Sequence, residues 1–234
     1  MLNSVTYGKD TIVFDLKYLV RKTLAIEVLP DSRVVIKAPV GTAIDEVSKR
    51  VVKRAQWIIT QQNYFRQFEP RTPPRQYVGG ETHLYLGKSY RLKLCSGAKN
   101  AIKLSRGYVL IEMPETSDTE AVRRLLLQWY TEKAKTKFVE VFEKCWLTFE
   151  KLGHAQPRIQ VRKMKKRWGS LSCNGLLTIN TDLIRAPKEC IEYVITHELC
   201  HLHYHDHSPE FYRLLEKVMP DWEKKKHKLE LALV

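Results

Sequence analysis

Hydrophobic and polar positions alternate in two short stretches near the start of the chain. "TLAIEVL" (23–29) and "RVVIKA" (33–38) are rich in β-branched residues, and "PDS" between them is a turn signal, so we expect a β-hairpin. Apolar residues then recur at helical spacing, which predicts one helix over residues 43–68 with Thr42 and Asp45 as a capping pair. The aromatic residues of this helix, Trp57 and Phe65, are expected to lie in the core.

The alternating pattern returns after a proline-rich connector, "EPRTPPRQ" (69–76). "THLYLGKSYRLKL" (82–94) and "AIKLSRGYVLIEM" (101–113) predict two further hairpins, which turn near Gly87 and Gly107. We therefore expect residues 1–115 to form an N-terminal β-rich region that contains the helix 43–68.

The second half of the chain begins with a long helical pattern. Ser117 and Glu120 form an S-x-x-E capping box. Apolar residues then keep helical spacing as far as Leu152 and Gly153, which predicts a long buried helix with at most one interruption.

A hairpin and another helix are expected to follow. "PRIQVRKMKKRWGSLS" (157–172) is predicted to be one strand, Asn174 and Gly175 a tight turn, and "LLTINTDL" (176–183) the return strand. A helix should begin near Lys188 and run into a histidine-rich stretch. The predicted fold class is therefore α+β, with residues 116–234 forming a zincin-like second region that is either separate from or continuous with the first.

The histidine-rich stretch "HELCHLHYHDH" (197–207) holds five of the chain's eight histidines. Each residue of a helix advances ~100°, so His197 and His201 share one face and Glu198 lies beside them. This is the HExxH arrangement, in which two imidazoles bind zinc and a carboxylate accepts a proton from a metal-bound water.

A catalytic zinc site needs a third protein ligand, for which His203, His205 and His207 are the candidates. On a continuing helix His203 would point away from the metal face, and His205 would lie at the end of a row too long for one ion. We expect both to be solvated surface residues. His207 differs because the helix must end before it, since Ser208 is a good N-cap and Pro209 suits the first position of the next helix.

We therefore assign one Zn²⁺ ion to His197, His201 and His207. The spacing of His207 after His201 equals that of metzincins, but Tyr204 stands where their motif has glycine, so a metzincin assignment fails.

The segments "RWGSLS", "GLLTINTDLIRAP", "IEYVITHELCHL" and "DHSPEFYRLLEKVMPDW" together resemble the YgjP-like metallopeptidase domain, a relative of SprT-type zinc proteases. The resemblance is densest over residues 158–222 and extends more loosely to the N-terminus. It implies zinc ligation by His197, His201 and His207 and a general-base role for Glu198. It also implies that the strand ending in "RWGS" holds an extended peptide by main-chain pairing.

The predicted function is zinc-dependent hydrolysis of peptide bonds in a protein or peptide substrate. Three residues remain candidates for stabilising the oxyanion: Arg167, Tyr204 and Tyr212. Trp168 has either a packing role or a role in the substrate pocket.

The formal net charge of +14 raises an alternative function. Such a charge implies attraction to polyanions, and six Lys and Arg residues fall within residues 158–167. This run is either a solvated face or a nucleic-acid footprint that includes Arg162, Lys163, Lys165 and Lys166. The alternative is therefore a nucleic-acid-associated protein with a structural or vestigial metal. Glu198 favours the enzyme, because a purely structural site has no use for a carboxylate at that place.

The cysteines and the hydropathy indicate the compartment. The five cysteines are scattered and form no CxxC motif, which argues against a disulfide framework and suits a reducing cytoplasm. No apolar run approaches the ~20 residues needed to cross a bilayer, and the first residues lack the layout of a secretory signal. We expect a cytoplasmic protein without a membrane partner.

Overall fold

The computed structural model describes residues 2–29, 31–66, 75–165 and 167–233. The chain forms two compact units that divide between residues 73 and 74. Most of the expected connector (69–76) lies outside the described residues. None of the described helices combines the length and the apolar composition needed to cross a bilayer.

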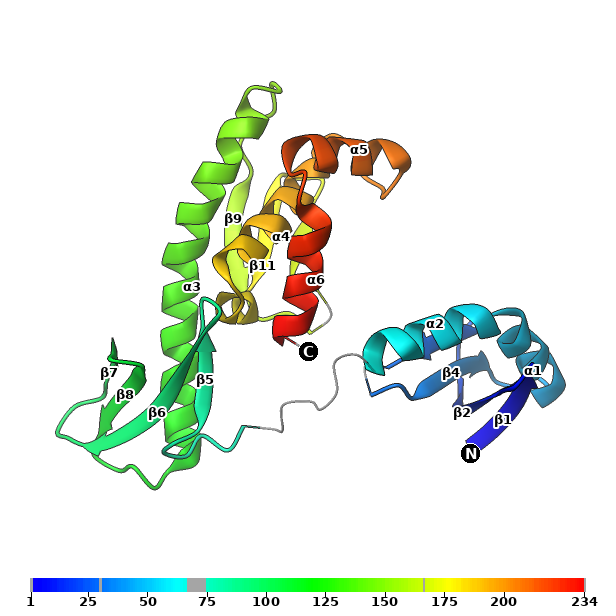
Figure 1. The fold of residues 1–234 in the computed structure, drawn as a ribbon, viewed down its shortest axis with the longest axis horizontal. Coiled ribbons are helices and arrows are strands. Elements are labelled where there is room, and N and C mark those ends of the chain that lie inside the picture. Colours follow the sequence, from blue (N-terminus) through cyan, green and yellow to red (C-terminus); the bar gives the residue numbers. More distant parts are fainter. Residues whose placement is uncertain (1, 30, 67–74, 166, 234) are drawn as a thin grey trace. The chain divides into compact units, whose positions relative to one another are not determined.

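The first unit is a four-stranded sheet covered by two helices (Figure 1). Its elements are β1 (Leu2–Tyr7), β2 (Asp10–Leu19), β3 (Ala25–Val28), β4 (Val34–Pro39), α1 (Ile44–Lys53) and α2 (Ala55–Arg66), with strand order β1-β2-β4-β3. The expected hairpin is confirmed as the antiparallel pair β3–β4. The sequence analysis did not identify β1 and β2.

Two details of the predicted helix 43–68 are wrong. The helix breaks at Arg54, whose φ of −106° and ψ of 7° end α1 before α2 begins. Thr42 does not cap α1, because Ala43 occupies the N-cap position and the hydroxyl of Thr42 instead donates to the carbonyl of Pro39. Both helices pack on the sheet through fully buried residues: Val47, Val51, Ala55 and Ile58.

The second unit begins with another four-stranded sheet, of order β5-β6-β8-β7. Its strands are β5 (Thr82–Tyr85), β6 (Lys88–Ser96), β7 (Ala101–Ser105) and β8 (Tyr108–Met113). Both predicted hairpins are confirmed, and their turns contain Gly87 and Gly107 at φ of +76° and +83°. Leu92, Val109 and Ile111 share one core with the helix that follows, so the boundary expected after residue 115 falls inside this unit.

That helix, α3 (Thr119–Glu150), is continuous over 32 residues. Its N-cap is Asp118, whose carboxylate accepts a hydrogen bond from the amide of Ala121 at 2.9 Å. The predicted capping box is therefore wrong, because the side chain of Ser117 donates to Glu115 instead. The helix runs along the remaining elements of the unit and supplies much of their core (Figure 1).

A three-stranded sheet and four short helices complete the unit. They are β9 (Arg158–Arg162), β10 (Gly169–Leu171), β11 (Leu176–Asn180), η1 (Thr181–Arg185), α4 (Lys188–Cys200), α5 (Pro209–Val218) and α6 (Trp222–Leu233). The predicted turn at residues 174–175 joins β10 and β11, which pair antiparallel. The α+β fold class is confirmed.

The prediction of a single strand over residues 157–172 is wrong. The central strand β11 pairs with β9 on one side and with β10 on the other, so the chain must cross over between the end of β9 and the start of β10. Asn180, almost fully buried, holds this crossing because its amide donates to the carbonyls of Met164 and Arg167, each at 2.9 Å.

Candidate metal centre

The helix α4 is buried over most of its surface. Nine of its 13 residues are buried, Ile191, Ile195 and Leu199 completely, and His197 and Glu198 lie on its last turn. The helix ends at Cys200, and His201 occupies the C-cap position with near-helical dihedral angles (φ −68°, ψ −10°). The two histidines of the motif therefore keep the one-turn relation that places both imidazoles on one face.

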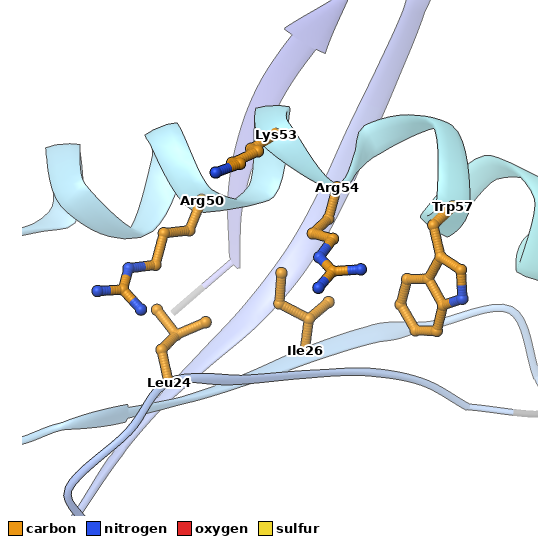
Figure 2. Close-up of a pocket in the computed structure, with 6 residues that line it drawn as sticks. All are labelled: Leu24, Ile26, Arg50, Lys53, Arg54 and Trp57. Atoms are coloured by element: carbon orange, nitrogen blue, oxygen red, sulfur yellow. The ribbon is translucent and has the colours of Figure 1, made fainter.

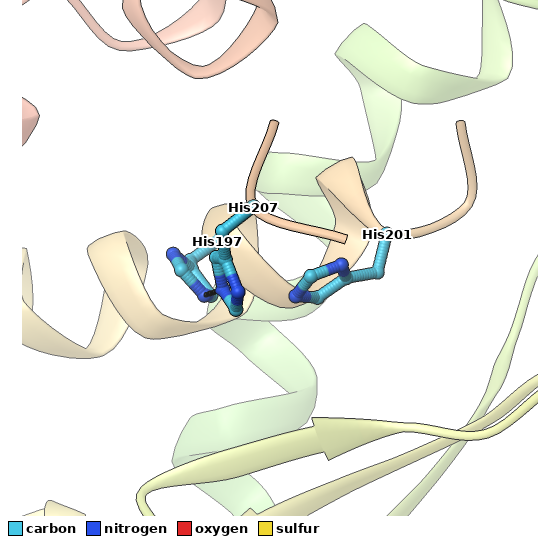
Figure 3. A group of neighbouring side chains, drawn as sticks. All are labelled: His197, His201 and His207. Atoms are coloured by element: carbon cyan, nitrogen blue, oxygen red, sulfur yellow. Dashed lines mark hydrogen bonds between the residues drawn. The ribbon is translucent and has the colours of Figure 1, made fainter. Parts of the chain in front are cut away.

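The chain turns back immediately after α4. Ser208 caps α5 by accepting a hydrogen bond from the amide of Phe211, and Pro209 occupies the start of that helix, as the sequence predicted. This bend brings His207 over the end of α4, so that its ring faces those of His197 and His201 (Figure 3).

The three imidazoles offer a compact set of ligand atoms. One nitrogen from each of His197, His201 and His207 lies within 4.8 Å of the other two. The Nε2 atoms of His197 and His207 lie 3.0 Å apart. Two imidazole nitrogens bound to one zinc ion lie about 3.4 Å apart, because each Zn–N bond is about 2.1 Å. The donor set therefore fits a single zinc ion after a small side-chain rotation.

Neighbouring groups orient these rings. The carbonyl of Tyr204 accepts a hydrogen bond from Nδ1 of His201 at 2.9 Å, which leaves Nε2 of that ring free to act as a ligand. The fully buried ring of Phe211 contacts all three imidazoles, with centroid distances of 5.0, 4.7 and 4.9 Å to His197, His201 and His207. The sequence pattern placed Phe211 only on the apolar face of α5, so its position under the cluster was missed.

The protonation of the cluster suits metal binding. Burial, together with the neighbouring rings of His201 and His207, lowers the pKa of His197 to about 4, so this imidazole is neutral at pH 7. Burial also lowers the pKa of His207. The nearby thiol of Cys200 is fully buried, which raises its pKa to about 12 and keeps it protonated. Neutral imidazole is the form that binds metals, so the histidines and not the thiol are the ligands available here.

Glu198 is held against the edge strand β10. Its side chain is only 9% exposed, and Oε2 accepts a hydrogen bond from the amide of Leu171 at 3.1 Å. Burial raises the pKa of Glu198 to about 7, against the opposing effects of this hydrogen bond and of Arg167. A pKa near neutrality suits a group that must both accept and release a proton.

Gly169 makes room for this carboxylate. A Cβ atom at position 169 would lie 2.7 Å from Cγ and 2.8 Å from Oε1 of Glu198, well inside van der Waals contact. The sequence analysis quoted this glycine only as part of "RWGS". Its lack of a side chain is what allows α4 and β10 to approach each other at Glu198.

We expect Gly169→Ala to displace Glu198 while leaving the three histidines in place. Peptide hydrolysis should be largely lost and zinc content retained, and overpacking should lower stability by about 1–3 kcal/mol. Gly79→Ala is the matched control, because a Cβ there has no neighbour within 4 Å. Zinc analysis, chemical denaturation and a hydrolysis assay measure the three effects. Full activity in Gly169→Ala would contradict the packing argument.

A cavity of about 680 Å³ opens beside the cluster. Arg167 and Trp168 line it, together with Tyr193, which the sequence analysis missed. Tyr204 and Tyr212 are not among the described residues that line it. Tyr204 lines a different hollow, and the ring of Tyr212 packs beside Trp222, with its centroid 6.3 Å from that of His207. Of the three candidates for stabilising the oxyanion, only Arg167 reaches this cavity.

The two remaining histidines of the motif stand apart from the cluster. His203 is exposed, and its Nδ1 lies 2.6 Å from Nε2 of His154, which follows α3. His205 is also exposed, as expected, but it lines the cavity. Neither belongs to the group of three ligand nitrogens.

The described cations of the basic segment lie at the surface. Arg162, Lys163 and Lys165 are all exposed, and Lys163 also forms an ion pair with Asp182. Lys166 lies outside the described residues. Nucleic-acid binding by this segment stays a prediction.

Comparison with known proteins identifies the family. A family described as "YgjP-like, metallopeptidase domain" matches residues 22–232. No curated protein matches the chain. Among solved structures, the metallopeptidase zymogen of Methanocaldococcus jannaschii jannalysin is 18% identical with a TM-score of 0.37, over 42% of this chain and 91% of that chain. The metallopeptidase zymogen of Pyrococcus abyssi abylysin is 27% identical with a TM-score of 0.33, over 39% of this chain and 87% of that chain. Since the family match spans nearly the whole sequence, the chain belongs to the YgjP-like metallopeptidase family.

Proposed function

We propose that this protein is a zinc-dependent peptidase of the HExxH type, with Glu198 as general base. The observation that carries the proposal is the convergence of three imidazole nitrogens within 4.8 Å beside a buried carboxylate. A zinc ion bound to His197, His201 and His207 would supply Lewis acidity and an activated water nucleophile. The carboxylate of Glu198 accepts a proton and returns it to the leaving amine.

The edge strand β10 is the proposed docking site for an extended peptide. Its inner main-chain groups pair with β11, since the carbonyl of Trp168 accepts from the amide of Asn180 at 2.8 Å and the amide of Ser172 donates to Leu176 at 3.0 Å. Successive residues of an antiparallel strand direct their main-chain N–H and C=O groups to opposite sides. Those of Gly169 and Leu171 therefore face α4 and the cavity. A substrate strand can pair along this edge next to Glu198, with Arg167 as the proposed donor to the developing oxyanion.

The rival function is a nucleic-acid-associated protein with a structural or vestigial metal. Burying a carboxylate costs free energy, and Glu198 has the raised pKa that results. A structural metal site has no role for a buried carboxylate that would offset this cost in free energy, whereas a hydrolytic site uses the carboxylate to accept a proton. The five cysteines are free thiols, which is consistent with our proposal that the peptidase works in the reducing cytoplasm.

Removal of the metal should abolish hydrolysis reversibly. We expect a chelator to stop cleavage of a reduced, carboxymethylated protein substrate, and stoichiometric zinc to restore it, because the three histidines are the proposed ligands. Mass spectrometry of the products measures cleavage, and circular dichroism checks that the fold persists without metal. Undiminished cleavage by the metal-free protein would refute the proposal.

A further inference from the structure

The first unit contains a groove of about 490 Å³ between the edge strand β3 and the two helices (Figure 2). Six residues line it: Leu24, Ile26, Arg50, Lys53, Arg54 and Trp57. All the residues of the proposed peptidase site lie in the second unit, so this groove is a separate feature.

Three cations and one aromatic side chain share a single face of α1 and α2. Positions 50, 53, 54 and 57 follow helical spacing, next to the buried face that covers the sheet. Arg50 pairs with Glu46 at 3.0 Å, but both side chains are more than half exposed, so the pair is weak. Within the described part of the chain, Lys53 and Arg54 form no ion pair. The groove therefore presents positive charge that is free to bind an anionic partner.

The groove also has an apolar surface. The side chains of Leu24 and Ile26 form its floor opposite the cations, and the indole of Trp57 lies at one end (Figure 2). The expectation that Trp57 is a core residue is wrong, because it is 42% exposed. An exposed indole next to unpaired cations is suited to a ligand with both apolar and acidic groups.

The strand β3 has a free hydrogen-bonding edge along this groove. It lies at the end of the strand order and, among the described strands, pairs only with β4. The amide of Leu29 donates to the carbonyl of Arg33 at 2.8 Å. In an antiparallel pair every second residue is hydrogen-bonded to the partner strand, so the main-chain groups of Glu27 and Ala25 also point toward β4. The main-chain N–H and C=O of Ile26 consequently face away from the sheet.

We propose that this groove binds an extended acidic polypeptide segment as an added strand on β3. Main-chain pairing at Ile26 would fix the segment, and its carboxylates would meet Lys53 and Arg54. An apolar side chain of the segment would contact Trp57. A peptide fits better than single-stranded nucleic acid, because successive bases need several aromatic platforms and Trp57 is the single aromatic residue among the described residues that line this groove.

The test measures binding of a fluorescein-labelled peptide of alternating glutamate and valine to the full-length protein by fluorescence anisotropy. About ten residues suffice to span a strand of this length. A lysine–valine peptide tests whether binding requires negative charge, and an N-methylated glutamate–valine peptide tests whether it requires main-chain hydrogen bonds. An oligothymidylate of similar length tests whether the groove binds nucleic acid instead. Mass spectrometry confirms that each peptide stays intact during the measurement.

The double variant Lys53→Glu/Arg54→Glu should weaken binding of the acidic peptide by about tenfold or more, as loss of charge-assisted hydrogen bonds requires. Trp57→Ala should also weaken it. Lys49→Glu is the matched control, because this exposed cation of α1 does not line the groove. All these positions are exposed, and circular dichroism verifies the fold of each variant.

Several outcomes would overturn the proposal. They are absence of binding by the glutamate–valine peptide, equal binding by the lysine–valine or N-methylated peptide, and equal losses in Lys49→Glu and the double variant. Tighter binding of the oligothymidylate through Lys53 and Arg54 would assign the groove to nucleic acid instead. None of these outcomes affects the proposed peptidase site, because the variants lie only in the first unit and change no residue of that site.

Discussion

Glu198→Gln should reduce peptide hydrolysis by about 10²–10⁴-fold, the usual contribution of general acid–base catalysis. Glutamine has the same shape and retains an oxygen that can accept the hydrogen bond from the amide of Leu171. It cannot take up a proton at neutral pH, so the loss should appear in the rate of hydrolysis and not in metal content or folding. The measurement is cleavage of an unfolded protein by metal-loaded wild type and variant at matched zinc occupancy.

Glu192→Gln is the matched control for this experiment. It makes the same chemical change on the same helix, but Glu192 does not line the cavity that contains the histidines. We expect its hydrolytic rate to equal that of the wild type. If Glu198→Gln also cleaved at the wild-type rate, the metal centre would not be the catalytic site.

His207→Ala should lower the affinity for zinc by more than about 100-fold, because loss of a ligand exceeds the 10–100-fold cost typical of changing a group that only orients a ligand. His207 is the proposed third ligand, and it comes from the segment beyond the end of α4 (Figure 3). Competition with a chromogenic chelator measures the affinity of each variant. Hydrolysis at limiting zinc should fall in parallel.

His205→Ala provides the comparison, because His205 lines the same cavity but contributes no nitrogen to the group of three. We expect it to bind zinc as tightly as the wild type, and likewise His203→Ala, whose ring pairs with His154. Retention of zinc in His207→Ala together with its loss in His205→Ala would show that the third ligand has been misassigned.

Features governed by neighbouring residues could be predicted from the sequence. The hairpin turns at Gly87 and Gly107, the capping of α5 by Ser208, and the apolar face of α4 depend on residues a few positions apart. The three proposed ligands could be identified for the same reason. Helical spacing places His197 and His201 on one face, and the end of the helix before Ser208 allows His207 to fold back toward them. Even local signals failed where two caps competed, as at Ser117 and Asp118.

Contacts between distant segments could not be predicted from these patterns. The pattern of residues 157–172 is compatible with one long strand, and only pairing of β11 with both β9 and β10 divides it. The packing of residues 77–113 in one core with α3 likewise sets the boundary between the units. A sequence pattern shows that a face is apolar, but it does not show which other face will cover it.

The sequence by itself determined the identity of the proposed metal ligands and the place of Glu198 beside them, because helix periodicity and capping act within one or two turns. Only the tertiary structure decided what surrounds them. It brought Gly169 against Glu198, placed Phe211 under three imidazoles, and excluded Tyr204 and Tyr212 from the cavity. It also left Trp57 at the rim of a basic groove. These relations arise from close packing between elements far apart in the chain, which no local pattern specifies.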